Sequence, residues 1–139
     1  MKGLTILQLI FILQFAPLTL SGQNQIVGKW LSPKRDAIVE IYELSGKFYG
    51  KIIWIKNTEN NNYPVDSNNP ETKLRTRPLI GSIVVRNLTY KENEWVEGSL
   101  YNPTTGKTYQ CKLELPELNT LKITCFLGPF YTSRIWTRH

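Results

Sequence analysis

The sequence predicts an all-β protein, a single small antiparallel up-and-down barrel of about eight strands with one long loop that carries a short helix. Three observations support this class. After residue 22, apolar and polar residues alternate with a period of two, turn-forming residues recur about every ten residues, and Val, Ile, Tyr, Trp and Thr are frequent. Closing such a sheet into a barrel removes its exposed strand edges.

The N-terminal segment, residues 1–22, is predicted to be a secretory signal peptide. Lys2 precedes the apolar run GLTILQLIFILQF, and small residues near Ser21 and Gly22 provide a cleavage site. Pro17 and two glutamines interrupt the apolar character of the segment, which argues against a stable membrane span.

Residues 23–139 are predicted to form one domain, exported to the periplasm or secreted. The net charge of the chain is +6, but Lys and Arg are scattered among Glu, so we expect no nucleic-acid-binding surface. The cleavage region contains no Cys, so we expect no lipid anchor. The oligomeric state is left open.

The first strand is expected near residues 27–31, and a hairpin around Ser45 and Gly46 is expected at residues 37–54. Pairing Leu44 with Lys47 sorts the hairpin into one apolar and one polar face. The apolar pairs are Val39 with Ile52, Ala37 with Trp54 and Ile41 with Gly50, and the polar pairs are Glu40 with Lys51 and Tyr42 with Tyr49.

The long connection at residues 57–80 is expected to carry a short helix. Asn69 is a good helix N-cap, and Pro70 suits the first helical position, so the helix is predicted from Pro70 to about Leu74. Pro78 then stops it. Long loops of this kind are often lids or binding loops.

A second hairpin is predicted at residues 81–101, with its turn at Glu92 and Asn93. In this register Trp95 shares the polar face with Arg86 and Glu97. The opposite face is apolar and consists of Ile83, Val85, Val96 and Leu100. Of the aromatic residues in or near strands, Trp54 is expected to point inward, and an interior filled by such residues would leave no cavity.

The third hairpin places Cys111 opposite Cys125 on its apolar face, and a last strand at residues 131–138 completes the sheet. Opposed strand positions can be bridged, and export favours oxidation, so a Cys111–Cys125 disulfide is predicted. The alternative is a pair of buried free thiols that pack as small apolar groups. A catalytic redox pair is disfavoured, because such thiols are usually exposed beside a basic group or a helix N-terminus.

Seven motifs occur in order along the chain: GKWLSP, DAIVEIYE, GKFYGKI, LRTRPLIG, YNPTTGKTY, LKIT followed by FLG, and terminal WTR. Together they resemble the bacterial exported domain-of-unknown-function family 2147, over nearly the whole region after residue 22. The resemblance implies a compact calycin-like barrel and no reaction. The chain departs from the family pattern at Lys34 and Arg35, where turn residues are usual, and at Cys111 and Cys125, where small residues are usual.

The two ends of the chain also resemble the closure of a lipocalin-like barrel. In that arrangement a Gly-x-Trp on the first strand meets an Arg near the end of the last. Gly28, Trp30 and Arg138 are the matching residues. A guanidinium can lie flat on an indole and donate to nearby carbonyls, so the implied role of Trp30 and Arg138 is structural.

Arg75 and Arg77 are the predicted ligand-binding residues. They precede a strand beside the long loop, where two guanidiniums could hold a carboxylate or phosphate head group while the barrel interior holds an apolar tail. The alternative is structural: one or both pair with Asp66 or Glu71, or donate to loop carbonyls.

No catalytic residue, metal ligand or cofactor is predicted. The only His is His139, at the C-terminus, so a Ser-His or Cys-His pair is not available. The glutamates alternate with apolar residues and are expected to face solvent. Asp66, Asn68 and Glu71 lack the ligand number and the Gly of a calcium loop, so a turn and helix cap are preferred.

Two functions remain as alternatives at this stage. The first is binding of a small apolar or amphipathic ligand, which requires an internal cavity of about 300 Å³ or more. The second is a structural or protein-interaction module of the cell envelope, which requires a packed interior and an exposed aromatic patch, for instance at Tyr42 and Tyr49.

Overall fold

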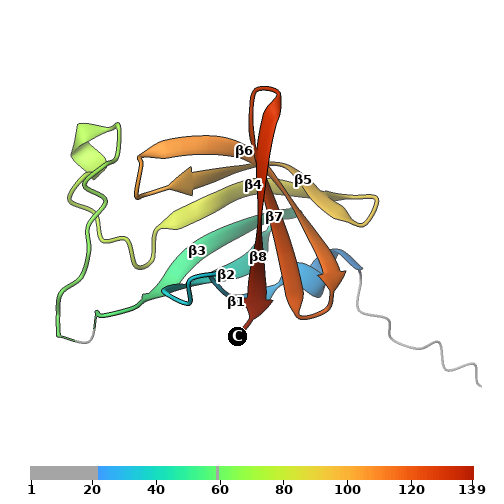
Figure 1. Ribbon diagram of the computed structural model, residues 1–139, viewed down its shortest axis with the longest axis horizontal. Coiled ribbons are helices and arrows are strands. Elements are labelled where there is room, and N and C mark those ends of the chain that lie inside the picture. Colours follow the sequence, from blue (N-terminus) through green and yellow to red (C-terminus); the bar gives the residue numbers. More distant parts are fainter. Residues whose placement is uncertain (1–21, 59) are drawn as a thin grey trace, which may run out of the picture.

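The computed structural model describes residues 22–58 and 60–139, so all of the predicted signal peptide except Gly22 lies outside the described residues. Eight strands pair in chain order and close into one antiparallel barrel, which confirms the predicted fold class (Figure 1). The strands are β1 (Gly28–Leu31), β2 (Ala37–Leu44), β3 (Lys47–Ile55), β4 (Ile83–Lys91), β5 (Glu94–Asn102), β6 (Lys107–Glu117), β7 (Thr120–Leu127) and β8 (Phe130–Arg138). No helix in the described part of the chain is both long and apolar enough to cross a bilayer.

The first hairpin has the predicted register over most of its length. Glu40 pairs with Lys51, Tyr42 with Tyr49 and Val39 with Ile52. The predicted register is wrong at the end of the hairpin away from its turn, because a β-bulge between Ile38 and Val39 shifts the pairing by one residue. Ala37 therefore lies opposite Ile55 rather than Trp54, and Trp54 is only half-buried.

A second bulge explains why Trp95 is buried and not on the polar face. Glu97 has a φ of 61°, and the pairing of β5 with β6 shifts between Trp95 and Gly98. The extra residue reverses the inward and outward alternation, so Trp95 pairs with Leu113 and keeps only 2% of its surface exposed. Gly98 is required beside it, because a Cβ there would clash with the side chain of Leu88.

The core is concentrated at the end of the barrel that carries the β2–β3, β4–β5 and β6–β7 turns. Phe48 and Trp95 meet edge to face, with ring centroids 6.5 Å apart and planes at 86°. Leu88 and Leu113 are fully buried in the same cluster. We call this the closed end, and we call the opposite end, where the long loop lies, the open end.

A short 3-10 turn, η1 (Gly22–Ile26), caps the closed end. The indole nitrogens of Trp30 and Trp95 donate to the carbonyls of Ile26 at 2.9 Å and Gln23 at 3.0 Å. The carbonyls of η1 therefore provide hydrogen-bond partners for both buried indole N–H groups.

The guanidinium of Arg138 fastens the first strand to the last. It lies 4.2 Å from the centre of the Trp30 ring and donates to the carbonyls of Gln25, Val27 and Leu118 at 2.8–3.2 Å. Trp30 and Arg138 are also backbone partners in the β1–β8 pairing. This geometry is the one that the lipocalin resemblance implied for the two residues.

The long loop at the open end carries η2 (Thr72–Leu74), a single 3-10 turn that begins two residues later than the predicted helix. Asn69 accepts a hydrogen bond from the backbone N–H of Glu71 at 2.8 Å, so its side chain still organises the turn. An isolated bridge between Val65 and Pro78 brings the two limbs of the loop together.

Candidate functional site

The barrel interior is filled at the closed end and empty above it. A cavity of about 660 Å³ opens at the end that carries the long loop. Its walls are mainly apolar and come from facing strands: Val39, Ile41, Ile52, Val85, Leu100, Leu121, Ile123 and Trp136. Trp30 forms part of the floor, next to the core cluster. A volume of this size lies within the range of small-molecule sites.

Three segments form the mouth of the cavity. They are the β1–β2 loop with Lys34 and Asp36, the β5–β6 loop from Asn102 to Thr104, and the tip of the β7–β8 hairpin. Ser32 stiffens the first of these, because its hydroxyl donates to the Asp36 carboxylate at 2.6 Å and accepts from two backbone N–H groups. The mouth is therefore bounded by short, ordered turns.

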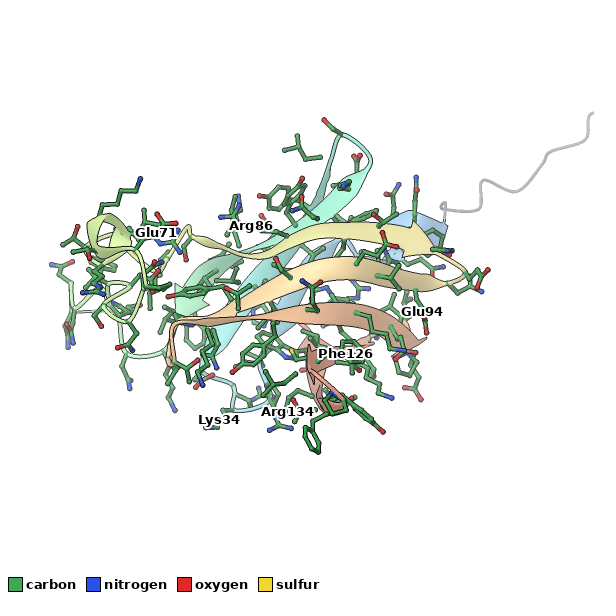
Figure 2. All side chains as sticks on the ribbon, turned by 90° about the horizontal axis from the view of Figure 1, so that it is seen from above. Lys34, Glu71, Arg86, Glu94, Phe126 and Arg134 are labelled. Atoms are coloured by element: carbon green, nitrogen blue, oxygen red, sulfur yellow. The ribbon has the colours of Figure 1, made fainter. Side chains whose placement is uncertain are left out.

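Two cationic side chains, Lys34 and Arg134, line the cavity from opposite sides of the closure between β1 and β8. Figure 2 shows both on the same side of the barrel. Within residues 22–58 and 60–139, neither makes an ion pair with a carboxylate. Arg134 donates only to the backbone carbonyl of Ser133, at 3.1 Å. Both charges are thus available to an anion at the mouth.

Arg75 and Arg77 lie elsewhere, in the long loop, and neither lines the cavity. Arg77 donates from Nε and Nη2 to the Asp66 carboxylate, both at 2.9 Å, and Arg75 donates to the carbonyl of Asn69 at 2.8 Å. These are the contacts expected if the two arginines have a structural role, pairing with a loop carboxylate and donating to a loop carbonyl. The assignment of the two arginines to ligand binding stays a prediction that this geometry does not support.

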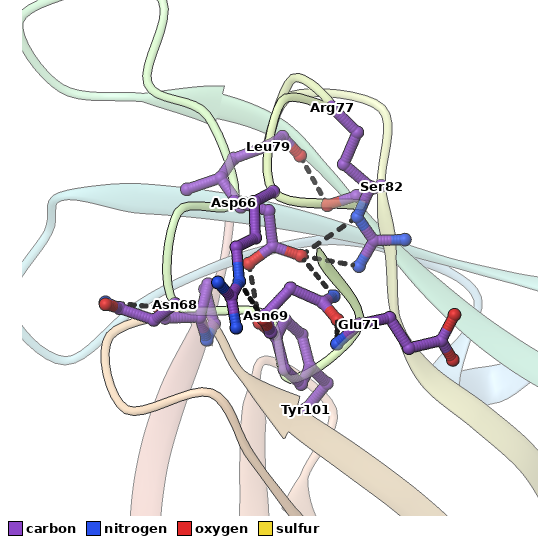
Figure 3. A network of polar contacts seen from close by, with 10 residues as sticks. Asp66, Asn68, Asn69, Glu71, Arg77, Leu79, Ser82 and Tyr101 are labelled. Carbon is purple, nitrogen blue, oxygen red and sulfur yellow. Dashed lines mark hydrogen bonds and ion pairs between the residues drawn. The ribbon is translucent and has the colours of Figure 1, made fainter. Parts of the chain in front are cut away.

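Asp66 is the centre of a buried polar network that holds the long loop against the barrel (Figure 3). Besides Arg77, its carboxylate accepts hydrogen bonds from Asn69 at 2.8 Å and from the hydroxyl of Tyr101 at 2.5 Å. Tyr101 lines the cavity, so the network joins the loop to its rim.

The network shifts the pKa values of both acids in it. Burial alone would raise the pKa of Asp66, but the hydrogen bonds from Asn69, Tyr101 and Arg77 outweigh it, and the net pKa is lowered. Burial and the adjacent carboxylate raise the pKa of Tyr101 to about 12. Asp66 is therefore ionised and Tyr101 protonated across the physiological pH range.

Cys111 and Cys125 lie directly opposite each other in the β6–β7 pairing, as predicted. The predicted disulfide is not formed, and both are free thiols. Burial, with a contribution from Cys125, raises the pKa of Cys111 to about 12, and burial also raises the pKa of Cys125. Cys111 belongs to the core cluster and Cys125 lines the cavity, so both pack as small apolar groups in protonated form.

The cavity is mainly apolar, with a small number of ionisable side chains in its lining. In the described part of the chain, no three His, Cys, Asp or Glu side chains come together in a way that could hold a metal ion. The ionisable groups in the cavity lining are Lys34, Asp36, Tyr101, Tyr109, Cys125, Tyr131 and Arg134. An apolar chamber with cations at its entrance can sequester an amphipathic anion.

Sequence reasoning did not assign Lys34 or Arg134 to the site, although a feature of the sequence singles out each of them. Arg134 is two residues from Trp136, so the two share the inward face of β8. A charged residue at an inward position of a barrel strand is unusual, because charged side chains are rarely buried. Lys34 stands where the family pattern has turn residues.

The fold and the cavity define a lipocalin-like barrel with an open, apolar interior. A structure of protein HP1028 from Helicobacter pylori, described as belonging to the lipocalin family, is similar to this chain. The two superpose with a TM-score of 0.72, share 24% sequence identity and are each covered over 82% of their length. At this identity the likeness establishes the fold alone.

The chain belongs to the family DUF2147, described as "Uncharacterized protein conserved in bacteria", whose model matches residues 28–138. This match confirms the resemblance drawn from the seven motifs. No curated protein matches the chain.

Proposed function

We propose that the protein binds one small amphipathic anion, with the apolar part inside the barrel and the charged head group between Lys34 and Arg134. The observation that carries this proposal is the apolar cavity of about 660 Å³ inside a closed barrel. A packed interior would have favoured the alternative of an interaction module without a ligand.

The expected aromatic patch offers no support for that alternative. Tyr42 and Tyr49 stack at 5.9 Å, but Lys51 lies 5.5 Å from the Tyr42 ring and pairs with Glu40 at 3.6 Å. The rings are half-buried among charges and do not form a continuous apolar surface.

The setting of the proposed function is outside the cytoplasm. A charged residue, an apolar run and small residues at a cleavage site support export of the domain that begins near residue 23. In that setting the barrel would carry or sequester its ligand.

Fluorescence titration with cis-parinaric acid, a fluorescent fatty acid, tests the proposal. We expect saturable binding, and we expect Arg134→Gln and Lys34→Gln each to weaken it by about tenfold, because a hydrogen bond to a charged group is lost. The methyl ester of the same fatty acid has no carboxylate, so its affinity should be unchanged by either substitution.

Arg75→Gln is the matched control, since it removes an arginine that does not line the cavity. It should leave both affinities unchanged. If Arg75→Gln weakened acid binding while Arg134→Gln did not, the head-group site would lie on the long loop and the assignment of the mouth would be overturned.

A further inference from the structure

The tip of the β7–β8 hairpin, residues 126–131, exposes a concentration of large apolar side chains. The exposed fractions are 36% for Phe126, 66% for Leu127, 74% for Phe130 and 69% for Tyr131. In Figure 1 this hairpin, drawn in red, projects beyond the sheet. Leu44 and Leu118 are also exposed, but they lie on separate turns, β2–β3 and β6–β7, and exposed apolar residues of this kind are ordinary on a protein surface.

The tip is apolar on both faces of the hairpin. Leu127 pairs with Phe130, and Phe126 pairs with Tyr131, with the two rings 6.5 Å apart. Successive strand residues point to opposite faces, so one pair faces each way. A hairpin that lay against its own barrel could bury one of these faces at most. Covering both requires surroundings that are apolar on all sides.

The β7–β8 hairpin itself carries charge of one sign. The chain from residue 120 to the C-terminus contains Lys122, Arg134 and Arg138 and no Asp or Glu. Lys122 pairs with Glu114, and Arg138 is held by backbone carbonyls, which leaves Arg134 as the available charge on the hairpin. Lys34 and Asp36 line the same cavity mouth from the neighbouring loop.

We propose that the hairpin tip docks into the interface of an anionic lipid membrane. Aromatic and aliphatic side chains beside Arg and Lys are the composition that enters the head-group region of a bilayer, where cations gain from anionic lipid. Leu127, Phe130 and Arg134 also line the cavity mouth, so docking would bring that mouth to the lipid surface. An amphipathic ligand could then pass between bilayer and barrel without crossing water.

A lipid surface fits these observations better than a second copy of the chain. A stable protein interface involves about 20–30 residues on each partner, whereas the tip has six. In a symmetric dimer through the tip, each Arg134 would approach the same hairpin of the partner, which carries no carboxylate to receive it.

Co-sedimentation with vesicles tests the proposal. The protein is purified from the soluble fraction, and mass spectrometry confirms that wild type and variants begin at the same residue. We expect binding to mixed phosphatidylcholine–phosphatidylglycerol vesicles that exceeds binding to phosphatidylcholine alone. Leu127→Ser should lower the partition by about tenfold through lost apolar burial. Arg134→Gln should lower it by about fivefold on the anionic vesicles only.

Leu44→Ser is the matched control. Leu44 is 57% exposed and, like Leu127, is the last strand residue before a hairpin turn, but at the closed end. It should not change the partition. The proposal is overturned if wild type stays in the supernatant with both vesicles, if Leu44→Ser and Leu127→Ser act equally, or if sedimentation equilibrium shows a dimer that Leu127→Ser dissociates.

Vesicle docking goes beyond the proposed ligand function and can fail separately from it. Titration with cis-parinaric acid in vesicle-free solution reports on the cavity alone. Binding of the fatty acid without vesicle binding would remove the docking proposal and leave the ligand function. Vesicle binding without fatty-acid binding would remove the ligand function and leave the docking proposal.

Discussion

Replacing Asp66 by Asn is expected to lower the free energy of unfolding by about 3–5 kcal/mol, the typical cost of removing one partner from a buried ion pair. The carboxylate is fully buried and accepts hydrogen bonds from Asn69, Arg77 and Tyr101. An amide of the same shape leaves the Arg77 charge without its partner. Chemical denaturation at neutral pH measures the difference.

The same substitution carries a pH signature. Because the pKa of Asp66 is lowered in the folded protein, its stabilising contribution is present above the unfolded value of about 3.9 and is lost as the pH falls through the lower folded value. The gap between wild type and Asp66→Asn should therefore be constant from neutral pH to about pH 5 and shrink below about pH 4.

Glu71→Gln provides the control for this experiment. Glu71 lies in the same loop, but its side chain is 61% exposed and its contact with Lys73 is 4.0 Å long. Losing such a surface pair should change stability by less than about 1 kcal/mol. A cost for Asp66→Asn that is no larger than this, or one that grows in acid, would show that the network does not hold the loop.

Replacing Trp30 by Ala is expected to destabilise the barrel by about 3–5 kcal/mol, because the indole is fully buried and its removal leaves a cavity. The change also removes the hydrogen bond to Ile26 and the ring beneath Arg138. Denaturant unfolding followed by far-UV circular dichroism measures the loss.

Trp54→Ala is the comparison for Trp30→Ala. Trp54 is half-buried and lies outside the cavity, so less surface returns to water and the cost should be clearly smaller. Equal costs at the two positions would mean that the closure between β1 and β8 adds nothing to the stability of the barrel.

Much of the fold was predictable because local pattern and turn chemistry agree. The Ser45–Gly46 turn and the alternation on either side fix the pairs from Val39–Ile52 to Leu44–Lys47, and the structure has them. The Cys111–Cys125 and Leu113–Ile123 pairs follow in the same way. Each of these registers depends on residues close together in the chain.

The two errors in side-chain orientation share one cause, which is a single extra residue in a strand. Bulges at Ile38–Val39 and between Trp95 and Gly98 reversed the predicted orientation of Trp54 and Trp95. A bulge costs little locally and is selected by packing across the barrel, so alternation within one strand does not reveal it.

The site was harder to predict than the fold, because it depends on which long-range partners a charge finds. Arg77 has a carboxylate within reach in its own loop, whereas Arg134 and Lys34 come from segments about a hundred residues apart and meet only after closure. The cavity itself is enclosed by all eight strands, so no single segment of the sequence predicts it. It exists because Phe48 and Trp95 pack at the closed end while Phe126 lies outside.

The most direct test of the ligand cavity is the affinity for a fatty acid in a variant that narrows the chamber. Ile123 lines the chamber and is the strand partner of Arg134, so Ile123→Trp places a larger side chain inside it, whereas Ile135→Trp adds the same side chain at an exposed position of β8. Calorimetric titration with dodecanoate should give one site per chain of similar affinity in wild type and Ile135→Trp, and clearly weaker binding in a folded Ile123→Trp. Absence of saturable binding to wild type, or equal binding by all three folded proteins, would contradict a ligand site inside the barrel.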